Sequence, residues 1–133
     1  MKRVVITGMG TVNPLGKNVS EFWDNIKANK LGFSYIDQFD ASDFDIKIVG
    51  AVKDFDPSAV IDKKEARRMD RFTQFALYSS YEAIKDCGTD FKDVDPFRCG
   101  VIVGVESVDS NSLRMNMKNL CRSLIKFRFS TSQ

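Results

Sequence analysis

The sequence contains no histidine among its 133 residues. Without an imidazole, the chain cannot provide a histidine general base, a catalytic triad that uses histidine, or a histidine metal ligand. Cysteine is also scarce, because only Cys87, Cys99 and Cys121 occur, far apart and odd in number. Cys87 and Cys99 are therefore interpreted as structural residues, and we predict neither a metal site nor a cofactor site.

Long apolar runs and an excess of one charge are missing as well. No stretch approaches the ~20 apolar residues that a membrane-spanning helix needs, and the apolar run near the start is too short for a signal peptide. Twenty basic residues against 18 acidic ones leave a net charge of +2, which favours neither nucleic acid nor a membrane as a partner. Because the apolar runs are this short, we expect a cytoplasmic protein. The 43% of hydrophobic residues predict a globular part.

The chain after Gly104 differs in composition from the chain before it. All eight glycines and all three prolines occur up to Gly104, whereas the 29 residues that follow have neither type and contain six serines. Residues 1–105 hold 15 basic and 16 acidic side chains, and residues 106–133 hold five and two. We therefore treat residues 1–104 and 105–133 as separate segments.

Hydrophobic spacing, capping residues and glycines predict six elements before this boundary. They are a buried strand from Arg3 to Thr7, a helix from Val19 to Ala28 capped by Asn18 and closed by Gly32, an extended segment from Ile46 to Val52, a helical turn at Asp56-Pro57, a helix from Arg71 to Cys87 ended by Gly88, and a central parallel strand from Gly100 to Gly104. This order predicts an α/β layer in which helices cover parallel strands.

Apolar residues at helical spacing predict which helix faces are buried. In the first helix these residues are Phe22, Trp23 and Ile26. In the second helix the stripe consists of Phe72, Phe75, Ala76, Ser79, Ala83 and Cys87.

Gly8-Met9-Gly10 follows the first predicted strand, as glycines do in a dinucleotide-binding turn. That fingerprint needs glycine or alanine three residues after its second glycine, where this chain has Asn13 followed by Pro14. The spacing therefore does not support a nucleotide site.

A dense group of basic residues lies between positions 62 and 71. On a helix, four of them would share one face, namely Lys64, Arg67, Arg68 and Arg71. One interpretation is a solvated helix surface balanced by neighbouring acidic residues, and the other is a docking patch for an acidic partner.

Several motifs occur together and in order over residues 1–104. They are Thr7-Gly8-Met9-Gly10, Pro14-Leu15-Gly16, Phe39-Asp40, Val52-Lys53-Asp54-Phe55, the block from Lys64 to Gln74, and Gly100-Val101-Ile102-Val103-Gly104. With these motifs the chain resembles the N-terminal segment of a β-ketoacyl-acyl carrier protein synthase of the KAS II type. The resemblance is specific, because the run Arg-Arg-Met-Asp-Arg-Phe-Thr-Gln within the block has no generic reason to recur.

The resemblance implies a partial thiolase-like fold, the N-terminal part of the first αβ half of a layered αβαβα architecture. Family members act as homodimers that elongate fatty acyl chains, condensing an acyl group held on a cysteine with malonyl-acyl carrier protein as carbon dioxide is lost. Lys64, Arg67 and Arg68 match family positions that meet the acidic acyl carrier protein, so the resemblance favours the docking interpretation. The residues that match backbone turns are Gly8, Gly10 and Gly16.

The resemblance stops after Gly104, where the family continues with Ser-Gly-Ile-Gly-Gly. Codons can be chosen for Gly104 to Ser110 that, read out of phase, encode Ser-Gly-Ile-Gly-Gly-Phe. We therefore hypothesise that a lost base put the divergent tail, residues 105–133, out of frame.

The nucleophilic cysteine and the two histidines of the family lie beyond the matched segment, so we predict that the chain alone is inactive. The alternative is a non-catalytic protein that binds acyl carrier protein or a full-length synthase. A small independent enzyme that uses Cys87 or Cys99 is a third hypothesis, which lacks a base within sequence reach.

Overall fold

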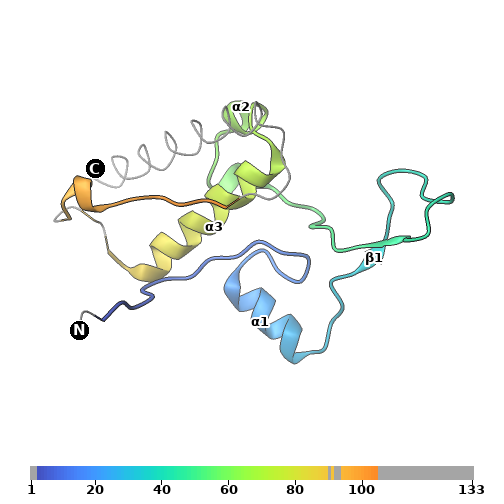
Figure 1. Cartoon of the computed structure of the whole chain (residues 1–133), viewed down its shortest axis with the longest axis horizontal. Helices are drawn as coiled ribbons and strands as arrows, with labels where there is room; N and C mark the ends of the chain where they lie inside the picture. Colours follow the sequence, from blue (N-terminus) through green and yellow to red (C-terminus); the bar gives the residue numbers. More distant parts are fainter. Residues whose placement is uncertain (1–2, 90, 92–93, 105–133) are drawn as a thin grey trace.

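The computed structural model describes residues 3–89, 91 and 94–104. Helix α3 (Arg71–Cys87) is the longest element in this part of the chain, and Figure 1 shows extended segments on both sides of it. The other elements are α1 (Val19–Lys27), β1 (Ser34–Tyr35), β2 (Ile48–Val49), η1 (Pro57–Ala59), α2 (Lys63–Ala66) and η2 (Pro96–Arg98). The predicted segment 105–133, including Cys121, lies outside the described residues, so the hypothesis of a frame change stays a prediction.

Helix α3 begins and ends at the residues that the sequence predicts. Gly88 follows its last residue with a φ of 68°, in the left-handed region that glycine adopts without a steric penalty. The Gly88 N–H donates to the Lys85 carbonyl at 3.3 Å, which closes the last turn.

The core lies where η1, α2 and the N-terminal half of α3 meet. Its buried apolar residues are Ile61, Ala66 and Leu77, and the partly buried residues packed against them are Val60, Met69, Ala76 and Val103. Val103 therefore brings the extended segment at the end of the described chain against the same core.

The predicted apolar stripe of α3 is only half-buried, and the fully buried positions of this helix are Thr73 and Leu77. The prediction misplaced the buried face because α3 is covered on two sides. The core contacts the Leu77 side, whereas the thin backbone of residues 8–10 crosses the stripe at Ser79 and Ala83.

Thr73 places an unsatisfied hydroxyl in this core. The side chain is 1% exposed, and its Oγ1 has no hydrogen-bond partner among the described residues. A threonine in a helix often donates to the carbonyl four residues earlier, but here the Met69 carbonyl accepts from the Gln74 side-chain amide at 3.1 Å.

We expect Thr73→Val to stabilise the chain by about 1 kcal/mol, because valine keeps the branched shape and removes a buried hydroxyl that lacks a partner. Thr73→Ser is the control, since it keeps the hydroxyl and loses the methyl group, and it is expected to destabilise. Urea unfolding of the three proteins measures both changes, and a loss of stability in Thr73→Val would contradict the prediction.

Helix α1 has the N-terminal cap that the sequence predicts. The Asn18 side chain accepts the Glu21 N–H at 2.8 Å, and the Glu21 carboxylate accepts the Lys17 N–H at 2.9 Å, an exchange of the capping-box kind. The helix ends where the sequence predicts, with Lys27 as its last residue and Ala28 as its C-cap. Asn29 follows with a left-handed φ of 54°, so the chain turns away from the helix before Gly32. The predicted apolar face is not covered, since Trp23 is 58% exposed and no residue of α1 is buried.

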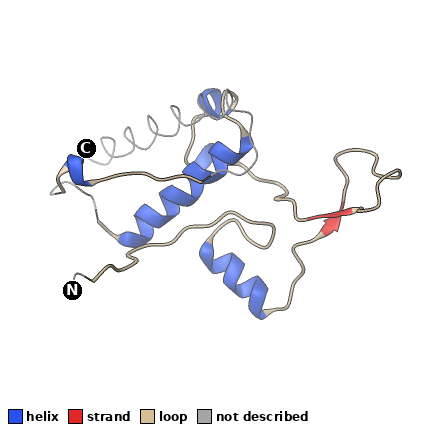
Figure 2. Ribbon diagram, in the orientation of Figure 1, coloured by secondary structure: helices blue, strands red, loops and turns tan. Residues whose placement is uncertain are grey.

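The described chain does not form the predicted layer of parallel strands. Its sheet has two strands of two residues each, β1 and β2, paired antiparallel with Ser34 opposite Val49. Figure 2 shows how small a share of the chain this sheet is. Of the predicted extended segment from Ile46 to Val52, only β2 pairs as a strand.

Two predicted strands, Arg3 to Thr7 and Gly100 to Gly104, are neither strands nor buried. Val4 is 96% exposed and Ile102 is 98% exposed. An apolar run between glycines becomes a central strand only if neighbouring strands bond to both its edges, and no described segment pairs with either run.

The turn predicted at Asp56-Pro57 is present as η1. The Asp56 carboxylate accepts the Ser58 N–H at 2.9 Å, and proline occupies the first position of the turn. The N–H and the hydroxyl of Ser58 hold the pKa of Asp56 below its usual value.

Candidate functional site

The three basic residues predicted to dock a partner lie at one short helix and the turn after it. We call Lys64, Arg67 and Arg68 the basic face. Asp62 begins α2 by accepting the Lys64 N–H at 2.8 Å, and Ala66 is 8% exposed against the core. Burial of Ala66 turns the other sides of this helical turn outward, and all three side chains of the basic face are exposed.

Arg71, predicted as a fourth member of this surface, belongs elsewhere. Helix α2 ends at Ala66 and a new helix starts at Arg71, so the residues do not share one helix face; Figure 1 shows α2 as a separate coil beyond the N-terminal end of α3. The Arg71 guanidinium donates to the Val52 carbonyl at 2.6 Å and lies 5.3 Å from the centre of the Phe75 ring. It therefore fastens residues 52–55 to α3.

Gly8 and Gly10 lie where the N-terminal segment crosses α3 at very short range. A Cβ at Gly8 would be 2.1 Å from the Ala83 carbonyl oxygen, and a Cβ at Gly10 would be 1.9 Å from the Ser79 carbonyl oxygen. The glycines are structural, as predicted, but Gly8 and Gly10 permit a close approach to the side of a helix rather than a turn. Gly16 does lie in a turn, which its paired backbone hydrogen bonds with Asn13 close.

Two carboxylates of α3 fasten the same segment, and sequence reasoning did not single them out. The Glu82 carboxylate accepts the Thr11 N–H at 2.9 Å and the Val19 N–H at 2.8 Å. Asp86, one turn later, accepts the Met9 N–H at 3.0 Å. Their four-residue spacing next to a half-buried stripe was the only signal in the sequence. Because both accept backbone N–H groups, this acidic pair is committed to structure.

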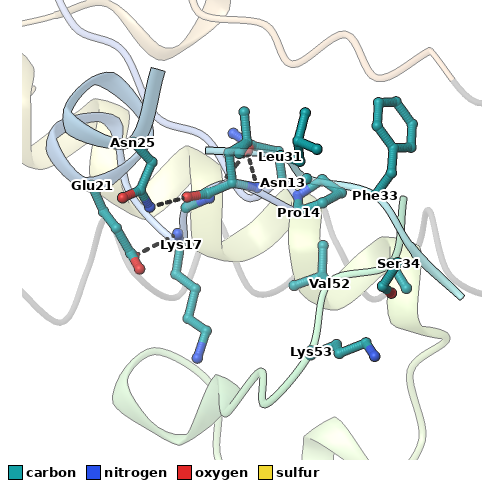
Figure 3. A pocket seen from close by; sticks show the side chains of 14 residues that line it. Asn13, Pro14, Lys17, Glu21, Asn25, Leu31, Phe33, Ser34, Val52 and Lys53 are labelled. Carbon is teal, nitrogen blue, oxygen red and sulfur yellow. Dashed lines mark hydrogen bonds between the residues drawn. The ribbon is translucent and has the colours of Figure 1, made fainter. Parts of the chain in front are cut away.

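A cavity of about 310 Å³ opens between the turn at residues 13–17, α1 and residues 51–53. Figure 3 shows Lys17 and Lys53 beside it, with the Asn25 side chain bonded to the Leu15 carbonyl at 2.5 Å. Lys17 donates to the Asp54 carbonyl at 2.7 Å, and Lys53 pairs with Asp37 at 2.5 Å. Both ammonium groups are thus engaged, and the residues that line the cavity include no cysteine and no histidine.

The described cysteines lie in different surroundings. Cys87 is half-buried at the end of α3. Its Cβ lies so close to Gly8 that a Cβ added at Gly8 would be 3.0 Å from it, as expected of a packing residue. Cys99 is exposed and lies immediately before the segment from Gly100 to Gly104 that was predicted as a strand, so no packing contact supports its interpretation as a structural residue. Within residues 3–89, 91 and 94–104, no three metal-ligating side chains gather into a site, and no helix is long and apolar enough to cross a membrane.

Comparison with known proteins finds a family whose sequence pattern covers most of this chain. Residues 1–127 match the family described as "Beta-ketoacyl synthase, N-terminal domain". The match therefore continues past Gly104, where the motifs stop.

Curated relatives carry the name 3-oxoacyl-[acyl-carrier-protein] synthase 2. The protein of Coxiella burnetii is 45% identical over 103 residues, and those of Staphylococcus aureus strain N315 and of Synechocystis are 44% and 40% identical over the same length. Each alignment covers 77% of this chain and 25% of the relative. The chain thus spans about a quarter of the length of the curated relatives that it matches.

Proposed function

The chain belongs to the β-ketoacyl synthase family, and we propose that its basic face docks acyl carrier protein during fatty acid elongation. In the proposed reaction, an acyl group held on a cysteine condenses with malonyl-acyl carrier protein, and carbon dioxide leaves. The curated relatives support the choice of partner, because their name includes acyl carrier protein. The mixed helices and strands are consistent with part of a thiolase-like fold.

The observation that carries this proposal is the exposure of Lys64, Arg67 and Arg68 around the buried Ala66. An acidic partner meets three cations on one solvent-facing turn, and such a surface raises the association rate and selects partners by charge. Arginine can also bind a carboxylate with two parallel hydrogen bonds, which gives the contact a preferred geometry.

We propose that catalysis depends on groups outside these 133 residues. The resemblance assigns the reaction to a cysteine and two histidines, and the 133 residues include no histidine. We therefore propose that these residues by themselves do not decarboxylate malonyl-acyl carrier protein. The second candidate function, favoured by the same observation, is a non-catalytic protein that binds the carrier or a full-length synthase in the cytoplasm.

Reversing the charge of the basic face with Lys64→Glu, Arg67→Glu and Arg68→Glu is expected to weaken carrier binding at least about tenfold at low salt, because three attractions become repulsions. Calorimetric titration of the 133-residue chain with acyl carrier protein measures this change.

The matched control is Lys27→Glu, Lys30→Glu and Lys85→Glu, which makes the same change in net charge at three exposed lysines outside the basic face. An equal loss in both triple variants would mean that only net charge matters. Unchanged binding in the basic-face variant would remove the proposed docking site.

A further inference from the structure

The loop that joins β1 to β2 carries a charge pattern opposite to that of the basic face. We call residues 37–45 the acidic arm, because they contain four aspartates and no basic residue. Figures 1 and 2 show this loop extending away from α3 beyond the two short strands. Between the aspartates, Phe39 and Phe44 are 54% and 57% exposed, with their rings edge to face at 5.7 Å.

One aspartate of the arm forms an ion pair within the molecule, and the other three are exposed to solvent. Lys53 pairs with Asp37 at 2.5 Å, and this hydrogen bond and charge lower the pKa of Asp37. The hydroxyl and N–H of Ser42 lower the pKa of Asp40. Asp40, Asp43 and Asp45 are all exposed, so the arm presents three carboxylates close in sequence to its two exposed phenylalanine rings.

The complementary surface on the same molecule is out of the arm's reach. The arm is held by the pairing of β1 with β2, whereas α2 packs on η1 and the core. In Figure 1 the arm points away from α2. An acidic arm and a basic face that do not meet within one copy can meet between two copies.

We propose that the exposed basic face of one copy docks the acidic arm of a second copy. Asp40, Asp43 and Asp45 would pair with Lys64, Arg67 and Arg68, and the two phenylalanine rings would cover the side chains of the arginines, a contact that arginine favours. The two surfaces differ, so the contact is heterologous, and an assembly that does not close into a ring leaves a free arm and a free face at its ends.

This inference goes beyond carrier docking and does not depend on it. Because a second copy would occupy the face that is proposed for the carrier, self-association and carrier binding would exclude each other.

The test is sedimentation velocity of the 133-residue chain over a range of concentrations. We expect concentration-dependent assembly at low salt that becomes about tenfold weaker in about 0.5 M sodium chloride, since exposed charges are screened. Assembly that salt leaves unchanged or strengthens would point to apolar aggregation and overturn the proposal.

Two neutral variants then test the surfaces one at a time. The arm variant carries Asp40→Asn, Asp43→Asn and Asp45→Asn, and the face variant carries Lys64→Gln, Arg67→Gln and Arg68→Gln. Each should be monomeric alone with an unchanged circular dichroism spectrum. An equimolar mixture should form a pair of one copy of each and stop there, because only one intact arm and one intact face remain. The control is Lys27→Gln, Lys30→Gln and Lys85→Gln, which should assemble like the unchanged chain.

The outcomes separate this inference from the proposed function. If the arm variant still assembles, or if the mixture stays monomeric, self-docking is wrong whatever the carrier does. If the mixture pairs but the chain binds no acyl carrier protein, the proposed function fails alone. If both hold, the arm variant should bind the carrier more tightly than the unchanged chain at assembling concentrations, because its faces are free.

Discussion

Gly10→Ala is expected to destabilise the chain by about 3 kcal/mol or more. The added Cβ would lie 1.9 Å from the Ser79 carbonyl oxygen and 2.9 Å from the Ala83 nitrogen. Both neighbours are backbone atoms of α3, so no side chain can rotate away to relieve the overlap. Either the helix must distort or the N-terminal segment must leave it, and the second change also breaks the hydrogen bonds of residues 9 and 11.

Thermal unfolding and amide exchange measure this effect. We expect a lower Tm and faster exchange at the Met9 and Thr11 amides, which α3 carboxylates accept at 3.0 and 2.9 Å. The matched control is Gly100→Ala, because nothing lies within 4 Å of a Cβ built at Gly100. If Gly10→Ala and Gly100→Ala have the same Tm and the same amide exchange rates, the close contact between the N-terminal segment and α3 is not formed in solution.

Glu82→Gln is expected to destabilise by about 2–3 kcal/mol. The carboxylate receives one N–H on each oxygen, from Val19 at 2.8 Å and Thr11 at 2.9 Å. Glutamine offers one carbonyl oxygen, and its NH₂ group would face the other N–H donor. One partly buried backbone N–H therefore loses its acceptor. If it is the Val19 N–H, the first turn of α1 loses its hydrogen bond to α3, and if it is the Thr11 N–H, the N-terminal segment loses it.

Chemical unfolding of Glu82→Gln is compared with that of Asp86→Asn and Asp24→Asn. Asp86 accepts a single exposed N–H, that of Met9, and asparagine can still accept it, so we expect a loss below about 1 kcal/mol. Asp24 forms an exposed ion pair with Lys27 at 2.7 Å, and its loss should be smaller still. Equal effects in all three variants would argue against a special role for Glu82.

Local signals in the sequence were sufficient for the start of α1 and for the end of α3. Asn18 at the start of α1 and Gly88 at the end of α3 act within four residues of themselves, so their effect does not depend on the rest of the fold. The family resemblance, which rests on runs of identical residues, is confirmed.

The strands were not predictable in this way, because a strand exists only with a partner. The run from Gly100 to Gly104 has the composition of a central strand, yet Ile102 is 98% exposed since no described segment pairs with it. The pairing of Ser34 with Val49 was indicated on one side only, because β2 lies within the predicted extended segment from Ile46 to Val52, whereas no prediction covered β1.

The sequence indicated three of the basic residues that lie together on the surface, but it wrongly added a fourth. Helical spacing correctly indicated that Lys64, Arg67 and Arg68 are exposed together. It failed for Arg71 because Met69 packs on the core and no glycine or proline marks the break between the two helices. Glu82 was missed for a different reason, since its partners lie 63 and 71 residues away in the chain.

That separation has a consequence for how the protein is made on the ribosome. The Thr11 amide is synthesised 71 residues before the Glu82 carboxylate that accepts it. At about 5–20 residues per second, the interval is on the order of 4 to 14 seconds. During that time the nascent N-terminal segment has no helix to lie against, and the Met9 and Thr11 amides have no carboxylate to donate to. The segment can therefore bind chaperones until α3 has been synthesised.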